Sequence, residues 1–201
     1  ARLPMELAHI YAMSQRFDKA EKFFKKAVLL DPDNLRPREE LASVQLAAGR
    51  TFEAARTLRL LLKEPSMEDR ADLHRNLASA YVKLNRHSDA RTHYLKVARS
   101  EAGRSDDWVM LGQLALRADK MFDALYASRK AIEMDGMNPQ SYLLCGMVWQ
   151  KKQRLDEALQ MFDRAAELSP DDASPLIMRG LSLQQAGRQV AAGEAYRQAL
   201  E

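Results

Sequence analysis

The side chains able to do metal or acid–base chemistry are few in this chain, and their spacing does not bring them together. His87 and His93 flank Asp89, but the two histidines are not an i, i+4 pair on one helical face, and they have no third ligand. His9 and His74 are isolated in the sequence. We interpret all four histidines as exposed or groove-lining side chains and predict no metal and no cofactor.

Nucleophilic catalysis is also poorly supported. Cys145 is the single cysteine, which excludes an internal disulfide framework. No basic neighbour or helix N-terminus is in place to lower the pKa of its thiol, so we predict a buried, inert side chain. The sequence contains no P-loop, no glycine-rich phosphate cradle and no HExxH motif. We therefore predict that the chain is not an enzyme.

The basic run KAEKFFKKA (residues 19–27) alternates lysines with aromatic residues, a pattern that can indicate RNA binding. Phe24, however, fits the buried face of a helix, and Lys22, Lys25 and Lys26 fall on its outer, solvated face. Residues 1–104 carry a net charge of +6 and residues 105–201 carry −3. This mild imbalance is not a nucleic-acid signature, and we predict no nucleic-acid partner.

The strongest pattern is an internal repeat. Small marker alanines recur at intervals of 34, 36, 34, 34 and 34 residues, namely Ala20, Ala54, Ala90, Ala124, Ala158 and Ala192. Twelve residues before each marker stands another small residue, in the series Ala8, Ala42, Ala78, Gly112, Gly146 and Gly180. Four residues after each marker stands a larger one, and only Ser128 breaks that series of Phe24, Leu58, Tyr94, Ser128, Phe162 and Tyr196. Six segments in step must be six copies of one structural unit.

Each repeat has the pattern of two amphipathic helices joined by a tight turn. Small residues on both helices allow their backbones to approach closely. Proline and acidic residues in DPDN (31–34) and SPDD (169–172) end the second helix and suit the start of the next. We predict an all-α chain of about twelve helices with no strand. Breaks are expected near Pro32, Pro65, Gly103, Gly136 and Pro170.

The period of 34, the Leu-Ala or Leu-Gly pair, the Ala-x3-Phe-x2-Ala spacing and the trailing proline resemble the tetratricopeptide repeat (TPR) family. Repeat 4 adds Trp108, Leu111 and Gly112, whereas repeat 2 has Gln45 in place of a tyrosine and two extra residues near KEPSME. The resemblance covers the whole chain as one array, divided into repeats 1–34, 35–70, 71–104, 105–138, 139–172 and a shortened 173–201. It implies a right-handed superhelical solenoid of antiparallel helix pairs.

The resemblance also implies that the first helices line a concave groove that binds other proteins. Groove positions in repeats 1 to 3 are mixed and charged, whereas those in repeats 4 to 6 are apolar with glutamines beside them. The predicted partner-binding residues are Val109, Gln113, Leu116, Arg117, Leu143, Met147, Gln150, Lys151, Ile177, Leu181 and Gln184, with Arg75 and Lys83 attracting acidic flanking residues.

The leading functional hypothesis is a non-catalytic protein-interaction scaffold that holds a partner peptide or helix. A self-assembling module that forms homo-oligomers is the first alternative, and an accessory domain of a larger enzyme is the second. Ala192, Tyr196 and Ala199 lie on a final helix with no following helix to cover it, so self-association through this C-terminal helix is expected.

The sequence begins ARLPMEL without an initiator methionine, and we expect it to be a fragment of a longer protein. It shows no signal peptide, and no apolar run approaches the roughly 20 residues that span a bilayer. Its plain composition fits a cytoplasmic or periplasmic bacterial scaffold.

Overall fold

The structure is a computed structural model that describes residues 2–200. Within that range the chain is all-α, as predicted, and has no strand. Its twelve helices are α1 (Arg2–Met13), α2 (Phe17–Leu30), α3 (Arg36–Ala47), α4 (Thr51–Leu61), α5 (Ala71–Lys83), α6 (His87–Ala98), α7 (Ser105–Arg117), α8 (Met121–Met134), α9 (Pro139–Lys151), α10 (Leu155–Leu168), α11 (Ser174–Gln185) and α12 (Gln189–Gln198).

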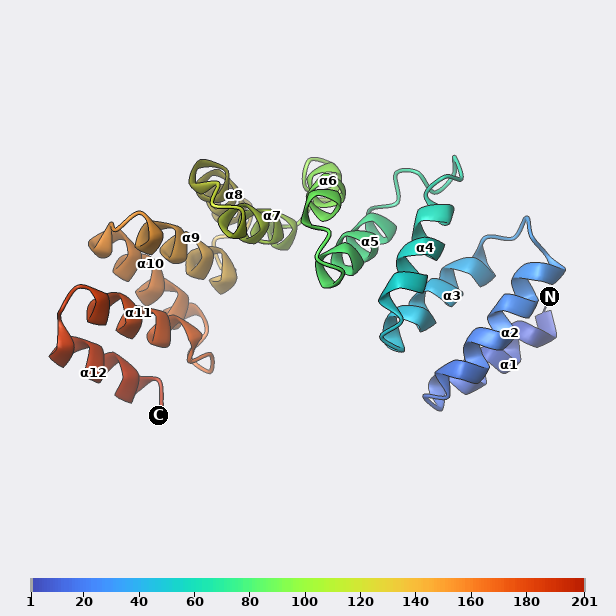
Figure 1. Cartoon of the computed structure of the whole chain (residues 1–201), viewed down its shortest axis with the longest axis horizontal. Coiled ribbons are helices and arrows are strands. Elements are labelled where there is room, and N and C mark those ends of the chain that lie inside the picture. Colours follow the sequence, from blue (N-terminus) through green and yellow to red (C-terminus); the bar gives the residue numbers. More distant parts are fainter. Residues whose placement is uncertain (1, 201) are drawn as a thin grey trace. The chain divides into compact units, whose positions relative to one another are not determined.

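The helices form antiparallel pairs in chain order, so that α1 packs on α2, α3 on α4, and so on along the chain (Figure 1). The chain divides into two compact halves, which we call the N-terminal half (residues 1–97) and the C-terminal half (residues 98–201). The grouping of all six repeats into one array stays a prediction. The all-α class of paired helices is confirmed.

Helix breaks fall at the expected places, because local side chains satisfy the first backbone N–H groups of the next helix. The Asn138 side chain accepts a hydrogen bond from the backbone N–H of Gln140 at 3.0 Å, and Pro139 occupies the first helical position of α9. Asp172 does the same for the N–H of Ser174 at 2.9 Å, ahead of α11. Pro32, Pro65, Gly103, Gly136 and Pro170 all lie between helices.

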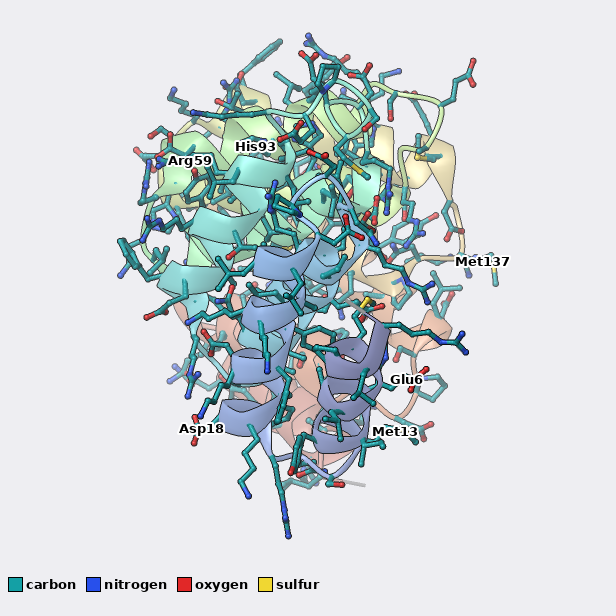
Figure 2. All side chains as sticks on the ribbon, turned by 90° about the vertical axis from the view of Figure 1, so that its right-hand side faces the viewer. Glu6, Met13, Asp18, Arg59, His93 and Met137 are labelled. Atoms are coloured by element: carbon teal, nitrogen blue, oxygen red, sulfur yellow. The ribbon has the colours of Figure 1, made fainter. Side chains whose placement is uncertain are left out.

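The turn between the two helices of each repeat contains a residue in the left-handed backbone conformation, with positive φ. This residue stands five positions before the marker alanine. Two of these are Gly49 and Gly187, with φ of 72° and 75°. The other four are Gln15, Asn85, Asp119 and Gln153, with φ between 55° and 59°. The first helix is therefore stopped by the same backbone conformation whether or not glycine is present. Met13 and Asp18 stand on either side of the first such turn (Figure 2).

The marker alanines are the core of each helix pair. All six are at most 2% exposed, and Phe24 and Phe162 are fully buried beside them. In repeats 5 and 6 the larger residue lies over the small residue of the preceding helix. A Cβ placed on Gly146 would come within 2.5 Å of the Phe162 ring, and one on Gly180 within 2.4 Å of the Tyr196 ring.

Repeat 4 solves the same packing problem differently, because Ser128 is too small to cover Gly112. The space above Gly112 is occupied from the following repeat, where Leu144 Cδ2 lies 2.4 Å from the position of an added Cβ. Ser128 is itself fully buried and donates its hydroxyl hydrogen to the carbonyl of Leu125 at 3.0 Å. The break in the sequence pattern therefore marks a site where two consecutive repeats interlock.

Gln45, which stands where the other first helices favour an aromatic or apolar residue, anchors a buried polar network in the N-terminal half. Its amide donates to Glu21 at 3.1 Å and accepts from the Thr57 hydroxyl at 2.8 Å. Arg50 also donates to Glu21. Lys25 completes the network with an ion pair to Glu21 at 2.8 Å. Lys25 lies on the exposed outer face of α2, as predicted, and also pairs with this buried carboxylate.

Burial raises the pKa of Glu21, but hydrogen bonds from Lys25, Gln45 and Arg50 outweigh it and lower that pKa to about 2. The Glu21 side chain is only 5% exposed, so its charge is balanced inside the structure rather than by water. The buried, hydrogen-bonded carboxylate of Glu21 therefore links repeats 1 and 2, in addition to their apolar packing.

Candidate functional site

Across residues 2–200, no group of three or more His, Cys, Asp or Glu side chains is placed to hold a metal ion. Cys145 is buried, and burial raises the pKa of its thiol, as expected for an inert side chain. Among these same residues, no helix is long and apolar enough to cross a membrane.

The histidines lie differently from the sequence-based interpretation. His74 pairs with His93 across α5 and α6, with their Nδ1 atoms 2.7 Å apart, while Nε2 of His74 donates to the carbonyl of Glu68 at 2.8 Å. His74 is only 5% exposed. Since a carbonyl only accepts, Nδ1 of neutral His74 must accept the hydrogen of His93. The pair is a structural contact beneath the 62–70 connection, where Lys96 Nζ also donates to the Glu68 carbonyl at 2.9 Å.

The predicted groove positions of the C-terminal half lie on its three first helices, α7, α9 and α11, which pack in sequence. Glycines make this arrangement possible, because Gly112, Gly146 and Gly180 let a neighbouring side chain reach the backbone of each helix. On α9 and α11, the residues on the side opposite these glycines face away from the second helices.

Exposure of the predicted apolar strip increases along the repeats. Val109 and Leu116 on α7 are buried, at 5% and 9% exposed. Leu143 and Met147 on α9 are half-buried. Ile177 and Leu181 on α11 are 43% and 38% exposed. Apolar surface is therefore available on α9 and α11, whereas the α7 positions belong to the packed interior.

Two of the predicted glutamines beside this strip have a side-chain hydrogen-bond partner. Gln150 on α9 donates to Gln185 on α11 at 3.3 Å, and Gln184 accepts from the Tyr196 hydroxyl at 3.0 Å. Gln113 is half-buried on α7. An amide side chain offers both donors and an acceptor, so this row of glutamines can bind a peptide backbone without requiring a charge on the ligand.

A cleft of about 370 Å³ opens at the same place, between the C-terminal part of α11 and the turn from α9 to α10. It is lined by Gln150, Gln153, Leu155, Ser182, Gln185 and Ala186. The predicted partner-binding residues include Gln150 but not Gln153 or Ser182. Gln153 is the positive-φ residue of its turn. Its position five residues before the marker alanine is the feature of the sequence that could have identified it.

The cations of the predicted site have different roles. Lys151 is already engaged, because its Nζ lies 2.7 Å from Asp119 and 3.5 Å from the carbonyl of Leu116. Arg117 is exposed at the end of α7. Lys83 is exposed and Arg75 half-buried, and Arg75 has an interaction of its own. Both belong to the N-terminal half, so the site described here consists of α7, α9 and α11 alone.

The C-terminal helix presents less apolar surface than expected. Ala192 and Ala195 are buried against α11, and Tyr196 is half-buried over Gly180. Ala199 is half-buried, while Val190 and Leu200 are 78% and 88% exposed. The predicted stripe of Ala192, Tyr196 and Ala199 therefore faces inward for the most part, and self-association through this helix stays a prediction.

Solved structures with the same arrangement of helix pairs confirm the fold. A TPR protein from Parabacteroides merdae matches with a TM-score of 0.86 at 17% identity, covering 99% of this chain and 78% of that one. YrrB, described as a TPR protein with an unusual peptide-binding site, matches with a TM-score of 0.68 at 21% identity over 88% of this chain and 90% of that one. MamA matches with a TM-score of 0.71 at 18% identity, over 80% of this chain and 92% of that one.

Sequence comparison agrees with the structural result. The human protein O-mannosyl-transferase TMTC3 is 23% identical over 93% of this chain, which spans only 22% of that protein. Tetratricopeptide repeat families match residues 11–68, 109–173 and 150–201, which is most of the sequence. Helix pairing, the marker residues and these matches agree: the chain belongs to the tetratricopeptide repeat family.

Proposed function

We propose that the chain is a non-catalytic protein-interaction module whose C-terminal half binds a peptide segment along α9 and α11. The observation that carries this proposal is the position of exposed Ile177 and Leu181 on the same helix as part of the glutamine-lined cleft. TPR domains typically act as protein-interaction scaffolds. The exposed apolar residues and the cleft on α9 and α11 support this role for the C-terminal half.

The chemistry of the surface favours an extended or helical segment with apolar anchors. Ile177 and Leu181 stand one helical turn apart and supply the exposed apolar contacts. Met147 is unbranched and polarizable and can adapt to side chains of different shape. The cleft of about 370 Å³ is large enough for an anchoring side chain, and its amide groups can bind the backbone beside it.

Charge makes a secondary contribution to peptide binding. Arg117 is exposed at the end of α7 and would attract acidic residues that flank the apolar anchors. Raising salt should therefore slow association without abolishing binding. The apolar contacts, not the charges, should determine affinity.

Peptide selection tests the proposal and requires no natural partner. A displayed library of random peptides is selected on the wild-type chain, and the recovered peptides are measured against Ile177→Glu, Leu181→Glu and Met147→Glu by fluorescence anisotropy. We expect peptides with spaced apolar residues that lose at least about tenfold in affinity for each variant, because each substitution places a charge against an apolar anchor. Circular dichroism checks that the helices remain.

The matched control is Lys22→Glu, which changes an exposed residue of the N-terminal half. Selected peptides should bind this variant as tightly as the wild type. Peptides that tolerate Leu181→Glu and Ile177→Glu but not Lys22→Glu would contradict the proposal. Sedimentation at several concentrations separates the self-assembly alternative, since a chain that binds itself through this face would dissociate on Leu181→Glu.

A further inference from the structure

The N-terminal half contains a second hollow that the peptide-binding proposal does not use. It has a volume of about 280 Å³ and lies between α4 and the turn from α5 to α6. Its lining includes Phe52, Arg56 and Arg59 from α4, and Tyr81, Leu84 and Arg86 from α5 and the turn. Three guanidinium groups and two aromatic rings therefore surround one small depression.

The three arginines of this hollow differ in their interactions with neighbouring side chains. Arg86 stacks over the Tyr81 ring at 4.4 Å and is oriented by Asp89 at 2.8 Å. Arg56 and Arg59 are exposed, and within residues 2–200 neither forms an ion pair with an acidic side chain. Arg59 lies at the outer edge of the view in Figure 2. Phe52 beside them is 67% exposed, so most of its ring is open to a ligand.

Most of the same side chains recur in the C-terminal half at the same positions relative to the marker alanines, although Tyr126 stands in the place of Arg56. Phe122 and Arg129 on α8 correspond to Phe52 and Arg59, and Trp149 and Arg154 correspond to Tyr81 and Arg86. Phe122 is 82% exposed. The cationic groups of Arg129, Lys152 and Arg154 lie 5.9, 5.8 and 6.0 Å from the Trp149 ring centroid. Arg154 is paired with Glu157, as Arg86 is with Asp89.

The other repeats show that the fold does not require this combination. Asp18 takes the place of Phe52 in repeat 1, where it forms an ion pair with Arg50, the equivalent of Arg86. Ser88 and Asp156 take that place in repeats 3 and 5. In repeat 1, Asp18 neutralises the arginine of the next repeat. In repeats 2 and 4 that arginine is paired with Asp89 or Glu157 instead, and the place of Asp18 is taken by the exposed rings of Phe52 and Phe122. Arg59 and Arg129, on the same helices as these rings, form no ion pair within residues 2–200.

We propose that these two sites bind acidic peptide segments that carry an apolar side chain. Arg56, Arg59 and Arg129 supply charge-assisted hydrogen bonds to carboxylates, and Phe52 or Phe122 covers the apolar side chain. The occupant is a peptide because tetratricopeptide repeat domains bind proteins, and the hollow of about 280 Å³ has room for one apolar side chain beside the arginines.

Calorimetric titration with a synthetic peptide tests this assignment. The probe has a central leucine flanked by aspartate and glutamate, and its counterpart has asparagine and glutamine instead. We expect the acidic probe to occupy two sites per chain, with affinity that falls as salt rises, and the amide probe not to bind. Arg56→Glu with Arg59→Glu should remove one site, and Arg129→Glu with Lys152→Glu should remove the other.

The matched control is Lys22→Glu with Lys26→Glu, which makes the same change of charge on α2 and should leave both sites intact. Leu181→Glu should also leave them intact, which separates this surface from the α9–α11 face. The proposal is overturned if the wild-type chain does not bind the acidic probe, or if either double variant binds it unchanged. Loss of binding on Leu181→Glu, or tighter binding of oligouridylate than of the acidic probe, would overturn it as well.

Discussion

The ring of Phe162 lies so close to the backbone of Gly146 that a Cβ on this glycine would come within 2.5 Å of Cε1. Phe162 is fully buried and cannot move outward, because Ala158 and Ala165 hold its helix against α9. This contact shows why a small residue is needed twelve positions before the marker alanine where a large residue stands four positions after it. They are the two sides of one packing contact.

Gly146→Ala should therefore destabilise the chain by about 1–3 kcal/mol, the typical cost of overpacking a core. Gly193→Ala is the matched control, because no atom lies within 4 Å of an added Cβ there. Alanine is a better helix former than glycine, so the control should gain up to about 1 kcal/mol. Chemical denaturation measures both, and equal effects would contradict the packing described for Phe162.

Lys25→Ala should lower the free energy of unfolding more than Lys22→Ala, although both lysines are exposed on α2. Lys25 Nζ lies 2.8 Å from the buried carboxylate of Glu21. Lys25 is itself 58% exposed, so we expect a loss of no more than about 1 kcal/mol. Urea titration of the two variants gives the comparison, and indistinguishable midpoints would show that Arg50 and Gln45 suffice for Glu21.

Acid should destabilise the Glu21 network over a defined range. The pKa of Glu21 is lowered in the folded state to about 2, from an ordinary value of 4.5. A lowered carboxyl pKa stabilises the fold above pH 4.5, and this contribution is lost as pH falls from 4.5 towards 2. Glu21→Gln should be less stable than the wild type at neutral pH, and the difference should shrink in this range. Unfolding midpoints measured at several pH values test this, and a constant difference would contradict it.

The histidine pair should respond at a higher pH. Burial lowers the pKa of both His74 and His93, and the positive charges of Lys96 and protonated His74 lower that of His93 further. The carboxylates of Asp69, Glu68 and Asp89 act in the opposite direction but do not outweigh burial. Because the folded state favours neutral imidazoles, stability is complete above the ordinary pKa of 6.5 and falls as pH drops below it.

His93→Gln provides the test of this pair. The variant removes one titrating ring, so its thermal midpoint should decrease less than that of the wild type between neutral pH and mildly acidic pH. A wild-type midpoint that stays constant across this interval would contradict the structural role of the pair.

Periodicity was sufficient to predict the helix pairs, because each repeat is specified by contacts within about one period of the sequence. The marker alanines and the breaks at Pro32, Pro65, Gly103, Gly136 and Pro170 follow directly from it. Periodicity did not predict which side chains of different helices contact one another. His93 was compared with His87 on its own helix, whereas the antiparallel return of α6 places it against His74.

The candidate site was predicted in part, for a related reason. A groove position can be assigned by its register, but its exposure depends on how neighbouring helices close over it. Val109 on α7 and Ile177 on α11 both stand fifteen residues before their marker alanines, yet the first is 5% exposed and the second 43%. Gln153 and Ser182 enter the cleft only because the end of α11 approaches the α9–α10 turn.

Within each half, the packing of helices on their neighbours in chain order has a consequence for how the molecule folds. The helix pairs form through contacts between residues close in sequence, so loop closure costs little conformational entropy and folding should be fast. Any helix pair can act as the nucleus, and structure can spread from it in either direction. Hydrogen exchange should accordingly show terminal helix pairs opening and closing many times during the lifetime of a folded central pair.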